Sequence, residues 1–505
     1  DFCVAHNAKF DLGWAERCGL DLGKIVTFDT MIGEYVLHGN TYVWHQLSLE
    51  SIAQRRYGEG KINIISQMIK SGIDTADIPE DWLEKYCIQD VDLTHRIFLD
   101  QRQNLADAGL LAVAYSRNLL TPVLTDIEKN GVQLDRVVVE RRAERCEIAY
   151  GESCRTIDEF TGGVNIASRV DLSSYLYETL AFDQVQKKMR GKWVADTTPT
   201  GQPKTDVATI NKLRPKTAKQ TAFLDLYKRN KELFNELTKY LRKFEECCND
   251  SGGLLLAGFN QTATRTHRLS STGRAYATQL HNIPRAYKPM FRARKQGWVV
   301  GEADGAQLEF RVAVHLGRDE TGLTDIINGT DVHSVSAGII GCSRQDAKAH
   351  TFKPLYGGQS GTPEQKRYYK HFRKTYKGIT ATQQRWIDEV LDTKSLRTEW
   401  GMRFHWPDTR MDRSGYVKNT TSISNYPVQS LATAEIIPFA LVCFWHRLRG
   451  SGLQMFIVNS VHDSIICEIP PDEIEAFHQL SRVALVDDVY ATLQGLYGIH
   501  FTAPL

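Results

Sequence analysis

Apolar and polar positions follow two different periods along this chain of 505 residues. In residues 1–105, short apolar stretches such as 24–29, "KIVTFD", separate segments whose apolar residues recur every three to four positions. The short stretches are typical of buried strands, and the longer period is typical of helices. Their alternation predicts an α/β domain in the first hundred residues.

The pattern is then helical to about residue 250, apart from the loop "DTTPTGQPKTD" (196–206) with its Pro and Gly turn signals. A strand is predicted over 297–304, "GWVVGEAD", and a helical block follows over 331–395. Residues 458–469, "VNSVHDSIICEI", predict two strands folded back on each other with His462 and Asp463 at the bend. This part of the chain predicts an α+β arrangement.

Residues 212–243 combine ten Lys or Arg with three acids, and the apolar residues there and just beyond follow a helical period. The segment predicts a helix with a basic outer face. A solvated surface is the usual explanation of such a face, and a polyanionic partner is the alternative. The apolar residues are Leu233, Phe234, Leu237, Tyr240, Leu241 and Phe244.

Length and composition narrow the class of protein. A chain of 505 residues predicts several domains, because single cores stop growing at roughly 250–300 residues. The apolar and charged fractions, 42% and 24%, are ordinary, and no uninterrupted apolar run reaches the roughly 18 residues that span a bilayer, so no membrane partner is predicted. The ten cysteines contain no CxxC pair, which indicates a reducing cytosol and neither a zinc site nor a disulfide framework.

Positive charge is concentrated locally, although the net charge is only +2. Residues 265–295 hold eight Lys or Arg and no acid, interleaved with Tyr276, Tyr287 and Phe291. Cations interleaved with aromatic rings are typical of surfaces that follow a phosphate backbone. The stretch therefore favours a nucleic-acid partner.

Two carboxylates are predicted at strand ends, Asp304 after "VVGEA" and Asp463 at the bend of the hairpin. Each alone is a common turn residue. A pair of them can hold two magnesium ions roughly 3.5–4 Å apart, as a two-metal phosphoryl-transfer site requires. The pair predicts such a site.

The segment "RQDAKAHTFKPLYGG" places two cations and two aromatic residues at steps of four. On one helix they would share a flank over about 18 Å, where cations can bind a triphosphate and rings can line a sugar and base. A basic amphipathic helix would give the same spacing, and Pro354 should bend the helix. The four residues are Arg344, Lys348, Phe352 and Tyr356.

These motifs together resemble the family A DNA polymerases, the DNA polymerase I type. "DGAQLEFR" resembles motif A, "RQDAKAHTFKPLYG" motif B and "VHDS" motif C, while "TRTHRLSSTGRAYATQLHNIPR" is similar to the segment that follows the primer–template minor groove. The resemblance implies a template-directed enzyme that transfers dNMP from a dNTP to a primer 3′-OH. Primer–template DNA and dNTPs would be its partners.

The resemblance also implies roles for single residues. Asp304 and Asp463 would bind two Mg²⁺ ions, and the Gly305 carbonyl would complete a coordination shell. The triphosphate would meet His333, Arg344 and Lys348.

The remaining residues carried over from the family would contact the sugar, the base and the duplex. Glu309 would be the steric gate against a ribose 2′-OH, Phe352 would pack beside the sugar 3′ position, and Tyr356 would stack near the templating base. Contacts with the DNA would come from Arg268, Asn282, Asn425, Gln429 and His462, with Arg268 at the minor-groove edge of the primer end.

The first hundred residues resemble the DEDD-type 3′–5′ exonucleases. "HNAKFD" is similar to their second motif, with Asn7 and Asp11, and "YCIQD" to their third, with Tyr86 to orient water and Asp90 to bind metal. The first motif, which supplies two acids, is not found and would lie before residue 1. We therefore predict a remnant domain with little proofreading, and a second pair of magnesium ions only in a complete parent chain.

The implied architecture is an RNase H-like exonuclease domain followed by a right-hand polymerase. Both ends of the chain are expected to be truncated. The predicted divisions are exonuclease 1–110, helical thumb 111–258, first part of the palm 259–335, fingers 336–404 and second part of the palm 405–505.

Three departures from the family pattern keep other functions open. Motif C has Ser464 where Glu is more frequent, motif A has Gly305 and Ala306 where Tyr and Ser are common, and Thr421 stands where Arg is usual. The single-subunit RNA polymerases share the first two features and are the first alternative, which Glu309 and the exonuclease remnant oppose. A catalytically silent nucleic-acid-binding protein is the second.

The "FKPLYGG" stretch is similar to that of phage-type members and favours a replicative polymerase of a phage. Such an enzyme would act in the cytoplasm of an infected or bacterial cell. No partner that confers processivity is predicted.

Overall fold

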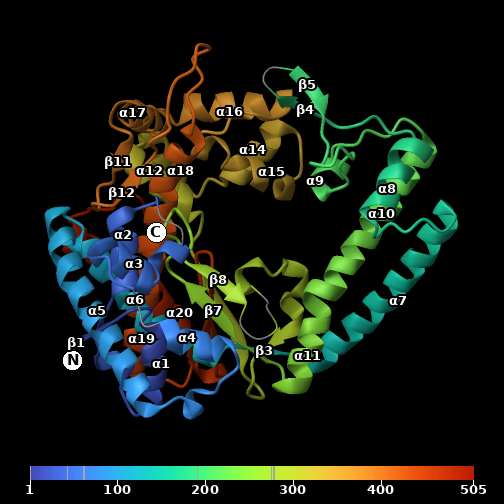
Figure 1. The fold of residues 1–505 in the computed structure, drawn as a ribbon. Coiled ribbons are helices and arrows are strands. Elements are labelled where there is room, and N and C mark those ends of the chain that lie inside the picture. Colours follow the sequence, from blue (N-terminus) through green and yellow to red (C-terminus); the bar gives the residue numbers. More distant parts are fainter. Residues whose placement is uncertain (1, 42–43, 61–62, 190–191, 274–275, 277–278) are drawn as a thin grey trace.

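The computed structural model describes the whole chain except residues 1, 42–43, 61–62, 190–191, 274–275 and 277–278. Figure 1 shows a body built from both ends of the chain, an arm of two long helices, α7 and α10, and a helical group that contains α14 to α17. Part of the basic stretch 265–295 lies outside the described residues.

The first hundred residues form the predicted α/β unit. Strand β1 (Phe2–Ala5) pairs in parallel with β2 (Val26–Asp29), which confirms the strand expected over 24–29. The Asp29 side chain caps the helix that follows β2 by accepting a hydrogen bond from the Met31 amide. The helices are α1 (Lys9–Arg17), α2 (Thr30–His38), α3 (Leu49–Tyr57), α4 (Asn63–Lys70) and α5 (Glu80–Asp107).

Helix α6 (Leu111–Asn130) joins this unit to the rest of the molecule. It is buried along most of its length and packs against β2, β13 and α19. The short strand after it, β3 (Val132–Leu134), pairs with β6 (Leu254–Leu255) and β9 (Phe291–Arg292). This small sheet is the base of the arm.

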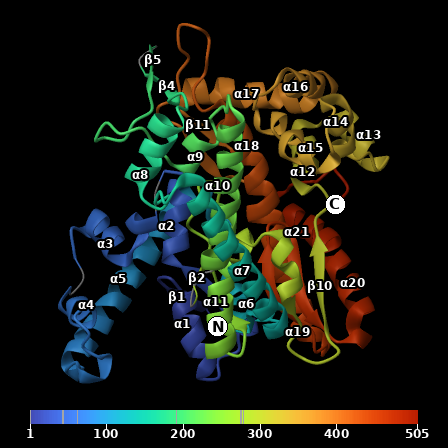
Figure 2. The same ribbon diagram turned by 90° about the vertical axis from the view of Figure 1, so that its right-hand side faces the viewer.

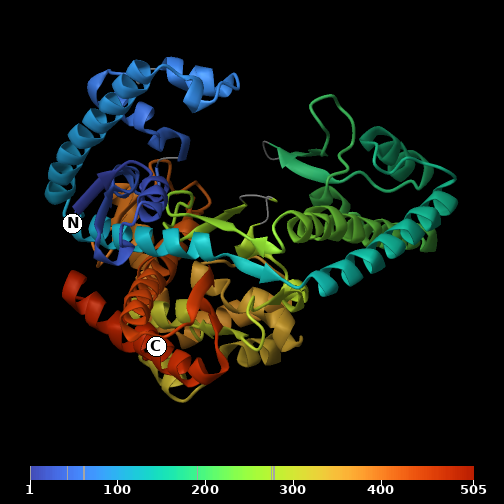
Figure 3. The ribbon, with the colours of Figure 1, turned by 90° about the horizontal axis from the view of Figure 1, so that it is seen from below.

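The arm consists of α7 (Arg136–Thr161) packed against α10 (Ala218–Glu236), which continues through a π-turn into α11 (Arg242–Asp250). Figure 3 shows the arm projecting from the body on the side away from α5. Thr217 and Gln220 form a capping box that starts α10. The helical period predicted for 212–243 is confirmed, with one difference, because Phe234 is 40% exposed while the other apolar positions are buried or partly buried.

The tip of the arm has a core of its own, formed by residues such as Leu176, Phe182 and Phe223. Two antiparallel strands lie there, in a region where the sequence predicted only helices and a loop. The elements of the tip are α8 (Arg169–Ser174), β4 (Gln186–Met189), β5 (Lys192–Ala195) and α9 (Val207–Ile210).

A three-stranded antiparallel sheet supports the candidate site. Its order is β10 (Val299–Asp304), β14 (Ser464–Ile469), β13 (Phe456–Val461), and both the predicted strand and the predicted hairpin are confirmed. Helix α20 (Ile474–Arg482) packs against β10 and β14, as Figure 2 shows. An added Cβ at Gly301 would lie 2.3 Å from the end of the Ile469 side chain and 3.1 Å from the Phe477 ring on α20, so a larger residue would force these side chains to shift.

The helical block over 331–395 is confirmed, and its internal boundaries differ from the prediction. Helix α15 (Arg344–Thr351) ends before Phe352, and Pro354–Tyr356 form a 3-10 turn. The prediction that one helix carries all four residues of the step-of-four pattern is wrong, because Pro354 provides no amide hydrogen to continue the helix. The neighbouring helices are α12 (Leu308–Gly317), α13 (Glu320–Ile327), α14 (Val332–Ile340), α16 (Pro363–Thr375) and α17 (Lys377–Thr393).

A long apolar helical run, Thr420–Ser451, is the one described segment that is long and apolar enough to cross a membrane. However, 83% of its apolar window is buried inside the protein, which is the position of a core helix. It consists of α18 (Thr420–Ser430), a π-turn and α19 (Ile437–Ser451). The remaining elements are β7 (Ala257–Asn260), β8 (Ser270–Gly273), β11 (Ser395–Arg397), β12 (Arg403–His405) and α21 (Asp488–Tyr497).

Candidate active site

The sheet brings the two predicted carboxylates together. Asp304 ends β10 opposite Ser464, and the Gly305 amide donates to the Asp463 carbonyl at 3.1 Å. Burial and the neighbouring Asp304 carboxylate, which shares a hydrogen bond with Asp463, raise the pKa of Asp463 to about 8. Two carboxylates held this close repel each other when both are ionised, and a divalent cation between them removes that repulsion. The pair therefore fits a magnesium site.

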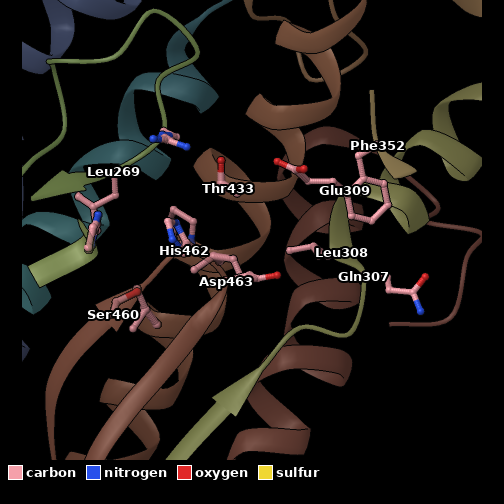
Figure 4. A pocket seen from close by; sticks show the side chains of 14 residues that line it. Leu269, Gln307, Leu308, Glu309, Phe352, Thr433, Ser460, His462 and Asp463 are labelled. Atoms are coloured by element: carbon pink, nitrogen blue, oxygen red, sulfur yellow. The ribbon is translucent and has the colours of Figure 1, made fainter. Parts of the chain in front are cut away.

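The hairpin bend positions Asp463. His462 has φ of 57°, a left-handed conformation that turns the chain in a tight bend. The Ser464 hydroxyl is buried and donates to the Val461 carbonyl at 2.9 Å, so it closes the bend. Figure 4 shows His462 and Asp463 at this bend, with the Asp463 carboxylate directed toward the segment that carries Leu308 and Glu309.

A cavity of about 290 Å³ lies beside the carboxylates. The predicted residues that line it are Arg268, Glu309, Phe352, His462 and Asp463. It is also lined by residues that the sequence did not single out, among them His281, Gln307, Leu308, Thr433 and Ser460.

Glu309 lies in the first turn of α12, at the side of this cavity. It accepts hydrogen bonds from the Tyr356 hydroxyl and from Gln429, while burial raises the pKa of its carboxyl group. Three predicted residues from α12, the 3-10 turn and α18 therefore form one hydrogen-bonded cluster. The cluster holds the Glu309 side chain in place near Asp463.

Phe352, next to the helical group, lines the cavity, whereas the predicted triphosphate ligands His333, Arg344 and Lys348 are not among its lining residues. His333 is 7% exposed, its ring lies 5.0 Å from that of Phe352, and burial lowers the pKa of its imidazole. Lys348 is near enough for its charge to lower this pKa further. Arg344 is exposed, and its Nε lies 2.5 Å from Oδ2 of Asp331.

Three predicted DNA contacts are not among the residues that line the cavity. One is Gln429, which bonds to Glu309 and remains a prediction as a DNA contact. The other two are Asn282 and Asn425. Asn282 ends a 3-10 turn and donates to the Gln279 side chain at 2.5 Å. Asn425 lies on α18, and its buried Oδ1 has no hydrogen-bond partner within the described part of the chain. Both remain predictions as DNA contacts.

The second exonuclease-like motif, residues 6–11, lies against Asp29, which the sequence did not single out. The Asn7 and Ala8 amides each donate to this carboxylate at 2.9 Å, and Asn7 has φ of 63°. Burial raises the pKa of Asp11, with a smaller contribution from the charge of Asp29. Tyr86 and Asp90 lie on α5. Among the described residues no group of three or more His, Cys, Asp or Glu is arranged to hold a metal ion.

Comparison with known proteins finds a matching family for each of the two parts of the chain. The sequence profile described as DNA polymerase family A matches residues 138–494, and the profile described as 3′-5′ exonuclease matches residues 2–105. The chain belongs to DNA polymerase family A. This confirms the fold class, an exonuclease domain followed by a polymerase domain of mixed helices and strands.

Relatives of this family A chain include the DNA polymerase I of Pseudomonas aeruginosa, 26% identical over 94% of the chain and 53% of that protein. The thermostable DNA polymerase I of Thermus thermophilus is 26% identical over 77% of the chain and 48% of that protein. The chain spans about half the length of these curated relatives.

A solved structure shares the fold of this family A chain. The POL domain of Pol1 from M. smegmatis, in complex with DNA primer-template and dNTP, aligns with a TM-score of 0.76 and 21% identity. The alignment covers 96% of this chain and 82% of that one.

Proposed function

We propose that this chain is a template-directed DNA polymerase that transfers dNMP from a dNTP to a primer 3′-OH. The observation that carries the proposal is the juxtaposition of Asp304 and Asp463 at the end of one antiparallel sheet, beside a cavity lined by Arg268, Glu309 and Phe352. Template-dependent extension of a labelled primer in the presence of Mg²⁺ tests it.

Asp304, Asp463 and the Gly305 carbonyl would hold two magnesium ions. When bound, these ions lower the pKa of the attacking 3′-OH and neutralise charge on the departing phosphate. Ser464 is assigned no metal-binding role, since its buried hydroxyl carries no charge and donates to the Val461 carbonyl. The protein contributes mainly position and charge, as is usual in phosphoryl transfer.

Arg344, Lys348 and His333 would bind the triphosphate. Arg344 is paired with Asp331, and this hydrogen-bonded pairing lowers the pKa of the Asp331 carboxyl. The pair lies on the exposed side of α15, where an exposed ion pair contributes little stability. A triphosphate can therefore replace Asp331 as the partner of the Arg344 guanidinium at a small cost in free energy. Burial keeps the His333 ring neutral, and a neutral ring can donate a hydrogen bond to the triphosphate.

The predicted domain divisions remain part of this proposal, with exonuclease 1–110, thumb 111–258, palm 259–335 and 405–505, and fingers 336–404. Helix α6 packs against the body of the molecule, so only the part of the thumb that begins with α7 projects from it.

The proposed partners are primer–template DNA and dNTPs, and the proposed location is the cytoplasm of a bacterial or phage-infected cell. The single-subunit RNA polymerase alternative is not favoured by the family match, nor by Glu309, whose carboxyl group is held beside the site by Tyr356 and Gln429.

Replacing Phe352 with tyrosine is expected to improve acceptance of dideoxynucleotides. The new hydroxyl would supply a polar group where the 3′-OH is missing, and one added hydrogen bond changes discrimination by roughly tenfold. The measurement is the ratio of ddNTP to dNTP incorporation on one primed template. Equal ratios in both proteins would show that residue 352 does not contact the 3′ side of the sugar.

We expect the 505-residue chain to excise a mismatched 3′ nucleotide poorly. Asp11 and Asp90 are its two predicted metal ligands there, and Asp29 is engaged with backbone amides, so two metal ions would be bound weakly. Release of a labelled mismatched nucleotide in Mg²⁺ without dNTPs measures excision, with Asp11→Ala as the control. Efficient excision that Asp11→Ala abolishes would contradict this expectation.

A further inference from the structure

The residue before Arg268 in the chain, His267, has a strained backbone. His267 has φ of 66°, a conformation that residues with a side chain seldom adopt, and it is only 3% exposed. Such strain persists where the surrounding structure holds the residue from several sides.

Residues of the exonuclease domain hold His267. The ring of Tyr35, on α2, stacks on the imidazole with the ring centres 4.0 Å apart. Nε2 of His267 lies 3.1 Å from the Gly39 carbonyl, just past the end of α2. The Tyr35 hydroxyl donates to the carbonyl of Thr264, at the other end of the same loop.

The end of α2 is itself fixed against the polymerase domain. An added Cβ at Gly39 would lie 2.2 Å from the Arg403 carbonyl, so only glycine fits there. Asn40 accepts a hydrogen bond from the His405 amide at 2.6 Å and donates to the His405 carbonyl at 2.9 Å. The α2 terminus is thus held between β12 and the loop.

A buried ion pair completes the support. Arg117 donates to the His267 carbonyl at 3.1 Å and is paired with Glu435, which is fully buried. Burial and the positive charge of Arg117 lower the pKa of His267, so its ring is neutral. A neutral ring with hydrogen on Nε2 is the form that can donate to the Gly39 carbonyl.

Arg268 itself depends on this support. Its guanidinium lines the cavity with Asp463 and, within the described residues, has no hydrogen-bond or ion-pair partner. Its backbone, in contrast, is held in place. The Arg268 carbonyl accepts a hydrogen bond from the Thr264 hydroxyl at 2.8 Å, and the Thr264 carbonyl in turn accepts one from the Tyr35 hydroxyl.

We propose that the exonuclease domain, through Tyr35 and the left-handed His267, positions Arg268 to read the minor-groove edge of the primer end. Tyr35 and His267 are positioning residues, since neither lines the cavity. The inference rests on the proposed polymerase function and adds a role for the exonuclease domain that does not involve excision.

The test compares extension of matched and mismatched primer ends, each with a phosphorothioate at the last linkage so that excision does not remove the mismatch. His267→Gly removes the ring and relieves the strain, and Tyr35→Phe removes only the hydroxyl. Both should lower the matched-to-mismatched ratio of kcat/KM, His267→Gly by roughly tenfold or more, because misplacing a contact group by about 1 Å is that costly. The ratio is independent of the fraction of folded protein.

The matched control is Tyr57→Phe, which removes a tyrosine hydroxyl bonded to Asp100 at 2.6 Å in the same domain, far along the chain from the loop. It should leave the ratio unchanged. In an Arg268→Ala background, His267→Gly should have no further effect on the ratio.

A normal ratio in both His267→Gly and Tyr35→Phe, or an undiminished effect in the Arg268→Ala background, would overturn the inference. Absence of extension by the unmodified chain would instead contradict the proposed function.

Discussion

Asp463→Ala is expected to abolish primer extension, with a loss of roughly four orders of magnitude in the single-turnover rate, because metal stabilisation of developing charge supplies several kcal/mol. The antiparallel register places Asp304 opposite Ser464, next to Asp463, and burial together with the Asp304 carboxylate raises the pKa of Asp463 to about 8. Removing one leaves a single carboxylate where two are required. Rapid-quench extension of a bound primer–template measures the rate.

Asp472→Ala is the control for that variant, since it removes an exposed acid in the turn that follows β14 and leaves the bend and its carboxylates unchanged. It should extend primers at nearly the normal rate. Duplex binding by Asp463→Ala should be retained, because a carboxylate that repels phosphate has been removed. Normal extension by Asp463→Ala would eliminate the two-metal assignment.

Glu309→Ala is expected to raise the use of ribonucleotides relative to deoxyribonucleotides by roughly 10- to 100-fold, the range for a pocket that gains room for one small group. The Glu309 carboxyl group is half-buried, is held by Tyr356 and Gln429, and lines the cavity where the proposal places the sugar, so removing it would make room for a 2′-OH. The ratio of rNTP to dNTP incorporation efficiency on one template measures the change.

Tyr356→Phe keeps the Glu309 carboxyl group and removes one of its donors, so its effect on sugar selection should be smaller. Glu320→Ala, an exposed acid in the first turn of the next helix, serves as a control that should leave selection unchanged. Unaltered selection in Glu309→Ala would show that the residue is not a gate.

The sequence predicts local elements well where one pattern dominates. The hairpin that bears Asp463 consists of two largely apolar runs on either side of a bend, and the structure has it at 456–469. The strands β4 and β5 were not predicted because most of their residues are exposed and lysines interrupt their apolar positions, so no buried apolar face reveals the period. Helix α15 ends early because Pro354 interrupts the hydrogen bonding that periodicity alone suggests.

The residues of the candidate site were likewise predicted only in part. Asp304 and Asp463 were recognisable from strand ends and motifs, and the antiparallel register brings them together. Contacts between distant segments leave no local signal, as with Tyr35 and His267, or with Glu309 and Tyr356. The contacts of Asp29 were also not predicted from the sequence, although a position at the end of a strand and before a helix is a recognisable capping position.

The central claim is that the paired aspartates make this chain a DNA polymerase. The most direct measurement is extension of a primed template in Mg²⁺ with dNTPs and rNTPs in separate reactions, with duplex binding measured in parallel. We expect template-directed incorporation of dNTPs in strong preference to rNTPs. Preference for rNTPs, or duplex binding with no incorporation of either, would contradict the claim.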